Sequence, residues 1–195
     1  MLIGPSGSGK GTVLKEVLKD DSNTFLSVSA TTRKPRPGEV DGEHYLFITK
    51  EEFETLIKTE SMLEYACYCE NYYGTPKATV LSRLNNGENV ILEIEMQGAK
   101  QIKTMYESAI LVFIVPPSLE VLRERLTKRG TEDIETINKR MDTAMCEIEF
   151  AEDCDYVVVN DTLEQAVEDV KSIITASGHR ANVMKEFIQE LKPVK

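Results

Sequence analysis

Gly4-Pro5-Ser6-Gly7-Ser8-Gly9-Lys10-Gly11-Thr12 is a glycine-rich stretch containing a lysine, and it decides the fold of this chain. It lies between a short apolar run at 1–3 and a helix-like stretch from Val13 to Lys19. The spacing G-x-x-x-x-G-K between a strand and a helix is typical of a loop whose backbone N–H groups surround phosphate oxygens, with the lysine reaching the β- and γ-phosphates. The following helix adds free N–H donors and the positive end of its dipole. The stretch therefore predicts a triphosphate site; the alternative is an ordinary turn.

One position departs from the general pattern, which has Ser or Thr directly after the lysine as a Mg²⁺ ligand. Gly11 stands there in this chain, and Thr12 follows it. Because Mg²⁺ keeps several of its waters, we expect the ion to be held either by Thr12 or mostly by water and phosphate oxygens.

Composition limits the class of protein. The chain has 195 residues, of which 41% are hydrophobic and 29% charged, so it can form one domain with a core. The net charge of -10 argues against a nucleic-acid partner and against an anionic membrane surface. Four cysteines without C-x-x-C spacing favour reduced thiols and a cytoplasmic location. Since only three residues precede the loop, we expect the first strand to be clipped.

Apolar runs alternate with helical patterns along the chain. Runs at 25–30, 90–94, 110–115 and 156–159 read as strands. Helical patterns cover 97–106, 118–128, 132–152 and 162–175. This order predicts an α/β fold of the P-loop NTPase type, a mostly parallel sheet with helices on both faces and ligands at the carboxyl ends of the strands.

The segment between the first two of these strands has a different character. It contains strands at 44–48 and 62–68, a capping box from Thr49 to Glu52 with a hydrophobic staple, and many tyrosines, and so reads as an insertion. A helix from Pro76 to Asn86 follows it. The prediction is a single domain over 1–195. It has a core at 1–30, 78–118 and 154–176, an insertion at about 31–77, a helical lid at about 119–153 and an extra C-terminal helix at about 179–192.

Arginines and tyrosines of the insertion could bind an anionic group. Arg33 and Arg36 lie on either side of Pro35, and the guanidinium fork matches phosphate oxygens. Hydroxyls for the same anion come from Tyr45, Tyr72 and Tyr73. The alternatives are a solvated basic loop and aromatic side chains that belong to the core.

Three carboxylates interrupt apolar stretches. Glu64 lies within the run at 62–66, where an unpaired carboxylate is costly unless a cleft exposes it. Glu93 and Glu95 lie at the end of the strand at 90–94, where ligands gather, with exposure on an edge strand as the alternative.

A second group of cations lies around a glycine hinge at 129–130. Such cations near a phosphate loop favour a closing lid, because phosphoryl transfer is mostly positioning and charge stabilisation. Interleaved glutamates and aspartates favour salt-bridged helix faces for part of the group. The members are Arg123, Arg125, Lys128, Arg129, Lys139 and Arg140.

Together these blocks resemble the guanylate kinases, enzymes that phosphorylate GMP with ATP. The resemblance spans the chain to about residue 175, in family order. The matching blocks are 4–12, 29–39, 42–47, 71–75, 92–99, 116–118, 125–131 with 138–140, and 159–161.

The resemblance implies a role for each matching residue. Arg33, Arg36, Tyr45 and Tyr73 would hold the GMP phosphate, while Glu64, Ser29 and Thr75 read the guanine and Glu95 contacts GMP or a metal-bound water. Lys10, Arg129, Arg140 and Arg33 would be catalytic. ATP would be bound by Gly4, Pro5, Ser6, Gly7, Ser8, Gly9, Lys10, Gly11, Thr12, Arg125, Asn160 and Asp161.

The implied activity is transfer of the ATP γ-phosphoryl to GMP or dGMP with Mg²⁺, by a monomer or a homodimer. Glu95 stands where the family commonly has aspartate, and the tail beyond Gly178 is longer than the family core. Two alternatives remain open. One is a binding module that takes phosphopeptides in the GMP cleft, and the other is a kinase that acts on a sugar phosphate, as in the phosphonate-pathway kinases that the chain also resembles.

Overall fold

A parallel sheet forms the centre of the molecule in the computed structural model, which describes residues 1–19, 21–68, 70–128 and 134–192. Strands β1 (Leu2–Ile3), β8 (Val112–Val115) and β9 (Tyr156–Val159) pair in parallel, as do β2 (Thr24–Leu26) and β7 (Asn89–Ile91). The N–H of Leu2 donates to Leu92 O at 2.8 Å, which joins the two groups in the order β2-β7-β1-β8-β9. The predicted parallel sheet is confirmed.

Helices cover both faces of this sheet. Leu2, Val112 and Ile114 pack against α1 (Lys10–Lys19) and α7 (Leu163–Gly178), whereas Ile3 and Phe113 face α4 (Met96–Met105) and the short 3₁₀ helix η1 (Phe150–Asp153). Successive strand residues point to opposite faces, so a wholly apolar run is what a strand buried on both sides requires.

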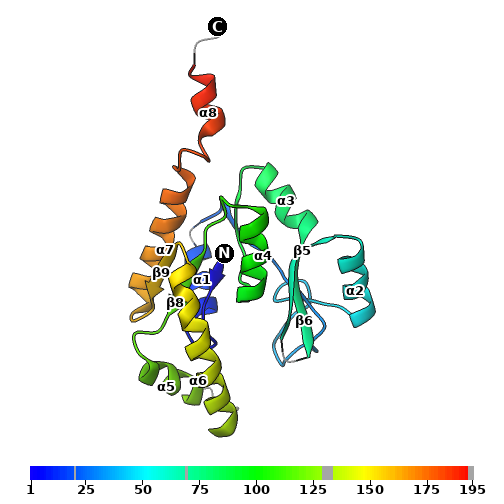
Figure 1. The fold of residues 1–195 in the computed structure, drawn as a ribbon, viewed down its shortest axis with the longest axis vertical. Coiled ribbons are helices and arrows are strands. Elements are labelled where there is room, and N and C mark those ends of the chain that lie inside the picture. The colour runs from blue at the N-terminus through cyan, green and yellow to red at the C-terminus, as the bar shows by residue number, and fades with distance from the viewer. Residues whose placement is uncertain (20, 69, 129–133, 193–195) are drawn as a thin grey trace.

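A second, mixed sheet lies beside the first (Figure 1). Its strand order is β4 (Leu46–Phe47), β3 (Ala30–Thr31), β6 (Asn71–Pro76) and β5 (Met62–Tyr68), with β3 and β4 parallel and the other pairs antiparallel. Helix α2 (Lys50–Lys58) begins with the predicted capping box, and its Phe53 is buried with Ile48 packed nearby. Helix α3 (Lys77–Asn85) leads back to the parallel sheet.

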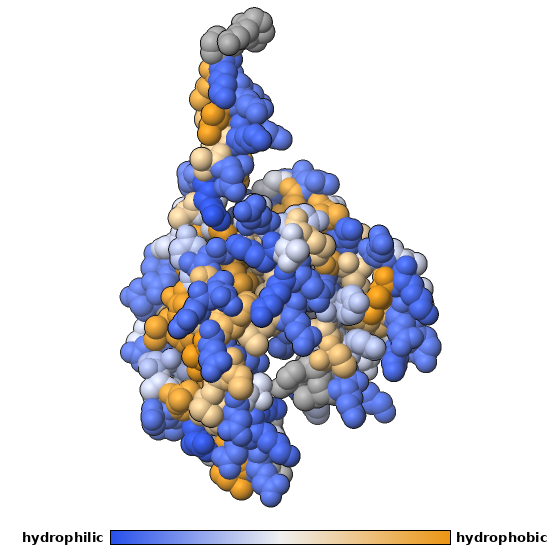
Figure 2. Space-filling model, viewed as in Figure 1, coloured by the Kyte–Doolittle hydropathy of each residue, from blue (hydrophilic) through white to orange (hydrophobic). Residues whose placement is uncertain are grey.

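Two helices form a separate lobe at one end of the molecule (Figure 1). Helices α5 (Leu119–Lys128) and α6 (Ile134–Glu149) share an apolar cluster that includes Leu122, Leu126 and Met141. At the other end, α8 (Lys185–Glu190) extends beyond α7 and contains no buried residue. Figure 2 shows this extension as a protrusion with hydrophobic residues on its surface.

Several predicted elements differ from those observed. The C-terminal helix expected at about 179–192 spans only 185–190, and the strand expected at 44–48 spans only 46–47. The strand expected at 25–30 is two strands, because the chain leaves the parallel sheet after Leu26 and joins the mixed sheet at Ala30. The strand expected at 90–94 is β7 at 89–91, followed by a single bridge from Glu93 to Leu2. The helix expected at 132–152 is α6 followed by η1, and 132–133 lie outside the described residues.

Among the described helices, none combines the length and the apolar character needed to cross a bilayer.

Candidate functional site

The phosphate loop connects β1 to α1 at the carboxyl end of the parallel strands. Gly7 and Gly9 have φ of +92° and +93°, a conformation that glycine adopts readily. The N–H of Ser8 donates to Pro5 O at 3.1 Å, and Lys10 Nζ donates to Gly4 O at 2.6 Å and Pro5 O at 3.2 Å. The lysine therefore lies across its own loop, where its ammonium would meet the phosphates of a bound nucleotide.

Two side chains support this loop from outside. Asn160, which is buried, donates from Nδ2 to Ser8 O at 2.8 Å, and a Cβ on Gly9 would overlap that same amide. Arg125 donates to Asn160 O at 2.9 Å and to Ser8 O at 3.4 Å. Asn160, one of the residues predicted to bind ATP, thus contacts the phosphate loop, and its neighbour Asp161 is exposed.

The cations of α5 and α6 divide into two groups. Arg125 and Arg140 contact the phosphate loop; Arg140 Nη1 donates to Ser6 Oγ at 3.1 Å. Arg123 instead donates to Asn138 Oδ1 at 2.8 Å, and Lys128 pairs with Glu124 at 3.8 Å. Only part of the predicted cation group therefore reaches the loop, and Arg129 lies outside the described residues.

Glu64 is buried in the mixed sheet and has one protein partner that fixes its orientation. Thr75 Oγ1 donates to Glu64 Oε1 at 2.6 Å, and Glu64 as a residue is 3% exposed. Burial raises the pKa of Glu64 to about 7; the bond from Thr75 acts in the opposite direction, and the charge of Glu95 adds to the rise. Ser29, half-buried, lies just before β3, where its carbonyl accepts from Leu46 N.

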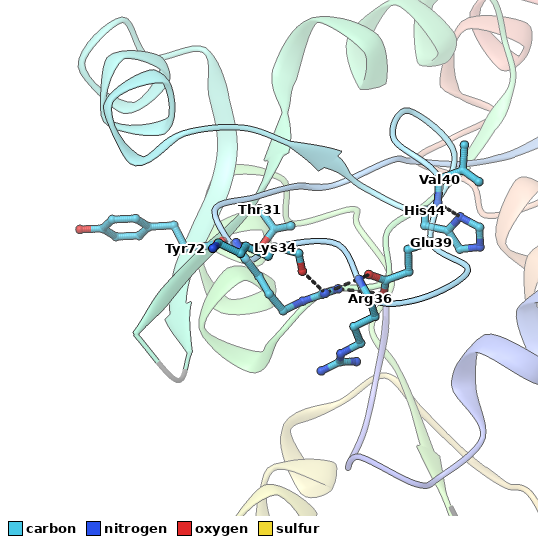
Figure 3. Close-up of polar contacts among 8 residues, drawn as sticks. Thr31, Lys34, Arg36, Glu39, Val40, His44 and Tyr72 are labelled. Atoms are coloured by element: carbon cyan, nitrogen blue, oxygen red, sulfur yellow. Dashed lines mark hydrogen bonds and ion pairs between the residues drawn. The ribbon is translucent and has the colours of Figure 1, made fainter. Parts of the chain in front are cut away.

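An arginine–tyrosine cluster lies on the same sheet. Arg33 lies over the ring of Tyr45 at 5.3 Å, and Tyr45 meets Tyr73 edge-on at 6.1 Å. Both terminal nitrogens of Arg33 donate to Glu39, each at 2.9 Å (Figure 3). This ion pair lowers the pKa of Glu39 to about 2 and raises the pKa of Arg33.

Arg36 differs from Arg33. Its backbone N–H donates to Glu39 Oε2 at 2.6 Å, while its guanidinium is exposed and extends away from that carboxylate (Figure 3). The structure thus places one of the two predicted arginines within the cluster and the other at its solvent edge.

Strand register explains which tyrosine of the pair 72–73 joins the cluster. Glu64 lies opposite Thr75 in the β5–β6 ladder, and Tyr73 is two residues from Thr75, so all three share one face. Tyr72 lies on the other face, where it stacks on Phe53 at 5.2 Å between ring centroids, and Figure 3 shows its hydroxyl pointing away from the arginines.

Two carboxylates, Glu93 and Glu147, lie close enough to Lys10 for its charge to affect their pKa values. Loss of hydration raises the pKa of Glu93, and Lys10 opposes this rise; Glu93 in turn raises the pKa of Tyr45, second to burial. Glu147 on α6 was not predicted from the sequence. Burial raises its pKa to about 7, Glu95 adds to the rise and Lys10 opposes it. Its spacing of seven residues from Arg140, two turns along one helix face, is the signal that could have identified it.

The oxygen donors near the loop fit a magnesium ion. Thr12 is exposed in the first turn of α1, and the carboxylates of Glu93 and Glu95 follow β7. No three His, Cys, Asp or Glu side chains come together as a metal cage within the described residues. Mg²⁺ is typically bound by one or two protein oxygens together with substrate phosphates and water, so this set suits it.

The parallel sheet with its phosphate loop, the arginines of α5 and α6 that contact this loop, and the arginine–tyrosine–glutamate surface of the mixed sheet together define a P-loop kinase that acts on a nucleoside monophosphate. The family model described as guanylate kinase matches residues 1–177. The chain belongs to the guanylate kinase family, whose activity is ATP-dependent phosphorylation of GMP.

Individual relatives agree with this assignment. The chain is 51% identical over 180 residues to the guanylate kinase of Desulfitobacterium hafniense (strain Y51), covering 92% of this chain and 90% of that protein. It is 48% identical over 190 residues to that of Clostridioides difficile (strain 630), covering 97% and 93%. The crystal structure of guanylate kinase from Anaplasma phagocytophilum superposes with a TM-score of 0.80 at 30% identity, covering 100% of this chain and 96% of the other.

Proposed function

We propose that the phosphate loop binds ATP and that the facing mixed sheet binds GMP or dGMP. The loop amides and Lys10 would hold the β- and γ-phosphates, since Lys10 already lies across the loop. Arg125 and Asn160 would support the loop through Ser8. Insertion residues 31–77 would be the GMP-binding part, and residues 119–153 the lid.

The nucleoside monophosphate would be bound at two points. Its phosphate would lie among Arg33, Tyr45 and Tyr73, with Arg36 closing from the solvent side, because a planar guanidinium and phenolic hydroxyls match phosphate oxygens. Its base would lie against Glu64 and Thr75, with Ser29 nearby.

The buried Glu64 is the observation that carries the choice of guanine. Guanine presents N1–H and its 2-amino group side by side, and one carboxylate accepts from both. Adenine has an acceptor at N1 and no 2-amino group, so it would offer the buried carboxylate no donor and would leave its contact from Thr75 as the one hydrogen bond described above. Such an incompletely paired group is costly, which supplies the discrimination between the bases.

Transfer requires positioning and charge neutralisation. A phosphate oxygen of GMP attacks the γ-phosphorus of ATP in line; the new O–P bond forms as the bond to the β-phosphate oxygen breaks, releasing ADP and GDP. Lys10 and Arg140 would neutralise charge on the transferred group, together with Arg129 and Arg33. Mg²⁺, held by Thr12, substrate phosphates and water, would neutralise further charge and orient the phosphates, with Glu95 near a bound water.

Replacement of the loop lysine tests the arrangement. Lys10→Ala is expected to abolish turnover while GMP binding largely survives, because GMP binds the opposite sheet. The measurements are a coupled ADP-release assay and calorimetric titration with GMP. Lys15→Ala, on the exposed side of α1, is the matched control and should retain turnover. Turnover that persists in Lys10→Ala, or GMP affinity that disappears with it, would contradict the proposal.

A further inference from the structure

Gly98 lies in the first turn of α4 at a place where nothing about the backbone requires glycine. Its conformation is helical, and glycine is among the least favourable residues within a helix. The residue is buried, and the reason for its small size must come from a neighbour.

That neighbour is the carboxyl group of Glu64. A Cβ added to Gly98 would overlap Glu64 Oε2, and it would lie 2.7 Å from Cδ and 3.2 Å from Cγ of the same side chain. The three atoms nearest to that Cβ all belong to Glu64. The missing side chain therefore leaves the space that one oxygen of Glu64 occupies.

Neither side can move aside easily. Glu64 is held by Thr75, which donates to its other oxygen at 2.6 Å. Helix α4 is held against β5 by Gln101, one turn after Gly98, which donates to Tyr65 O at 2.7 Å and accepts from Tyr65 N at 3.2 Å. Since Tyr65 follows Glu64 directly, these two bonds fix the distance between the helix and the carboxyl group.

We propose that Gly98 is a positioning residue for base selection: its lack of a side chain lets Glu64 take the orientation in which both carboxylate oxygens face the base. This rests on the proposed role of Glu64 in reading guanine. A methyl group at position 98 would push Oε2 away and break either the Thr75 bond or the two-point contact with guanine.

The test is Gly98→Ala, measured by the Kd of GMP, by the Kd of a non-hydrolysable ATP analogue, and by the ratio of kcat/KM for GMP over AMP. We expect the Kd of GMP to rise about tenfold to a hundredfold, as for loss of a hydrogen bond to a charged group, with a matching fall in the GMP/AMP ratio. ATP-analogue affinity should remain unchanged. Gly178→Ala, at the end of α7 where a Cβ meets nothing within 4 Å, is the matched control.

Two further variants show whether Gly98 acts through Glu64. Glu64→Asp shortens the side chain by one methylene, so adding it to Gly98→Ala should restore part of the GMP affinity. In a Glu64→Ala background, Gly98→Ala should cost almost nothing more. A loss of GMP affinity of the same size in that background, or an equal loss of ATP-analogue affinity, would overturn the proposal.

The proposed roles of Gly98 and Glu64 can be refuted separately by experiment. If Glu64→Gln leaves GMP binding unchanged, the assignment of Glu64 as the base reader is wrong, and the proposal for Gly98 falls with it. If Glu64→Gln weakens GMP binding and Gly98→Ala does not, only the role of Gly98 is refuted.

Discussion

Glu64 can change its charge near neutral pH while remaining buried. Its raised pKa comes first from loss of hydration, and the nearby charge of Glu95 adds to the rise. In the free protein the carboxyl group is therefore about half protonated at pH 7, whereas a base that donates two N–H groups needs the ionised form. Binding of guanine should consequently release a proton.

This predicts a pH dependence of GMP affinity. As the pH falls below about 7, the Kd of GMP should rise by up to about tenfold per pH unit, because binding must first remove the proton from Glu64. Above pH 7 this contribution vanishes. Calorimetric titration would measure this dependence. A range from about pH 5.5 to about pH 8 brackets both the pKa of Glu64 and the second pKa of the phosphate.

Glu64→Gln provides the control for the titration of GMP itself, whose phosphate has a second pKa near 6. At pH 8 the variant should bind GMP at least about tenfold more weakly than the parent chain. The ratio of the two Kd values should shrink as the pH falls. A ratio that stays constant across the range would contradict the prediction.

Asn160 leads to a prediction for the ATP side. Asn160→Ala removes the donor to Ser8 O and leaves that buried carbonyl with only the long contact from Arg125. We expect KM for ATP to rise about tenfold or more, with little change in KM for GMP. Steady-state kinetics with each substrate varied in turn would show the split, and Glu168→Ala, at an exposed position of α7, should leave both values near those of the parent chain.

At the level of single residues, the sequence predicted chemistry better than orientation. A carboxylate within an apolar run identified Glu64, and the Gly-Lys spacing identified the loop. The sequence could not show that Asn160 donates to Ser8 of the loop, or that Arg33 is bound by Glu39. Both contacts depend on how the chain folds. Glu147 was missed because its signal, a place two turns after Arg140 on one face of α6, has meaning only once Arg140 is known to contact the loop.

Helix α2 is the element whose start the sequence defined most completely. Thr49 Oγ1 accepts from Glu52 N at 3.2 Å, and Glu52 accepts from Thr49 N at 2.8 Å. These reciprocal bonds satisfy N–H groups that the first turn of a helix leaves without partners. Helix α2 in turn places Phe53 beneath the mixed sheet.

Thr49→Ala should therefore destabilise the protein by about 1 kcal/mol, the usual cost of losing an N-cap. Urea unfolding followed by circular dichroism would measure the free energy of unfolding. Thr55→Ala, within the same helix and exposed, is the control, and it should be neutral or slightly stabilising because alanine is the better helix former. An equal loss in both variants would show that the capping box contributes nothing.

Strands were harder to predict than helices. Seven-residue β5 was identified by its alternation, but β6 was not separated from the turns and tyrosines of the insertion. Its Gly74 and paired tyrosines carry little period-two signal, and the strand is defined by the partners on either side of it. Pairing between distant segments is a tertiary property that local sequence does not encode.

At the scale of the whole molecule, we expect the C-terminal extension that contains α8 to be dispensable for activity. Removal of residues 185–195 should leave kcat/KM within about twofold, because α8 contributes no buried residue. Removal of α7 as well should prevent folding, since Ala166 and Val170 belong to the core. Kinetics and thermal melting of the two truncated chains would check this, and a large loss of activity in the shorter truncation would refute it.

The two sheets share no strand in the described part of the chain. A movement of the mixed sheet toward the phosphate loop would therefore leave the backbone hydrogen bonds within each sheet intact. Two features resist such a movement: the packing of Leu63 against Ile102, and a pair of side-chain bonds from Gln101 to the backbone of Tyr65, next to the carboxylate proposed to read the base. Tyr65, through which α4 is bonded to the mixed sheet, thus directly follows Glu64 in the chain.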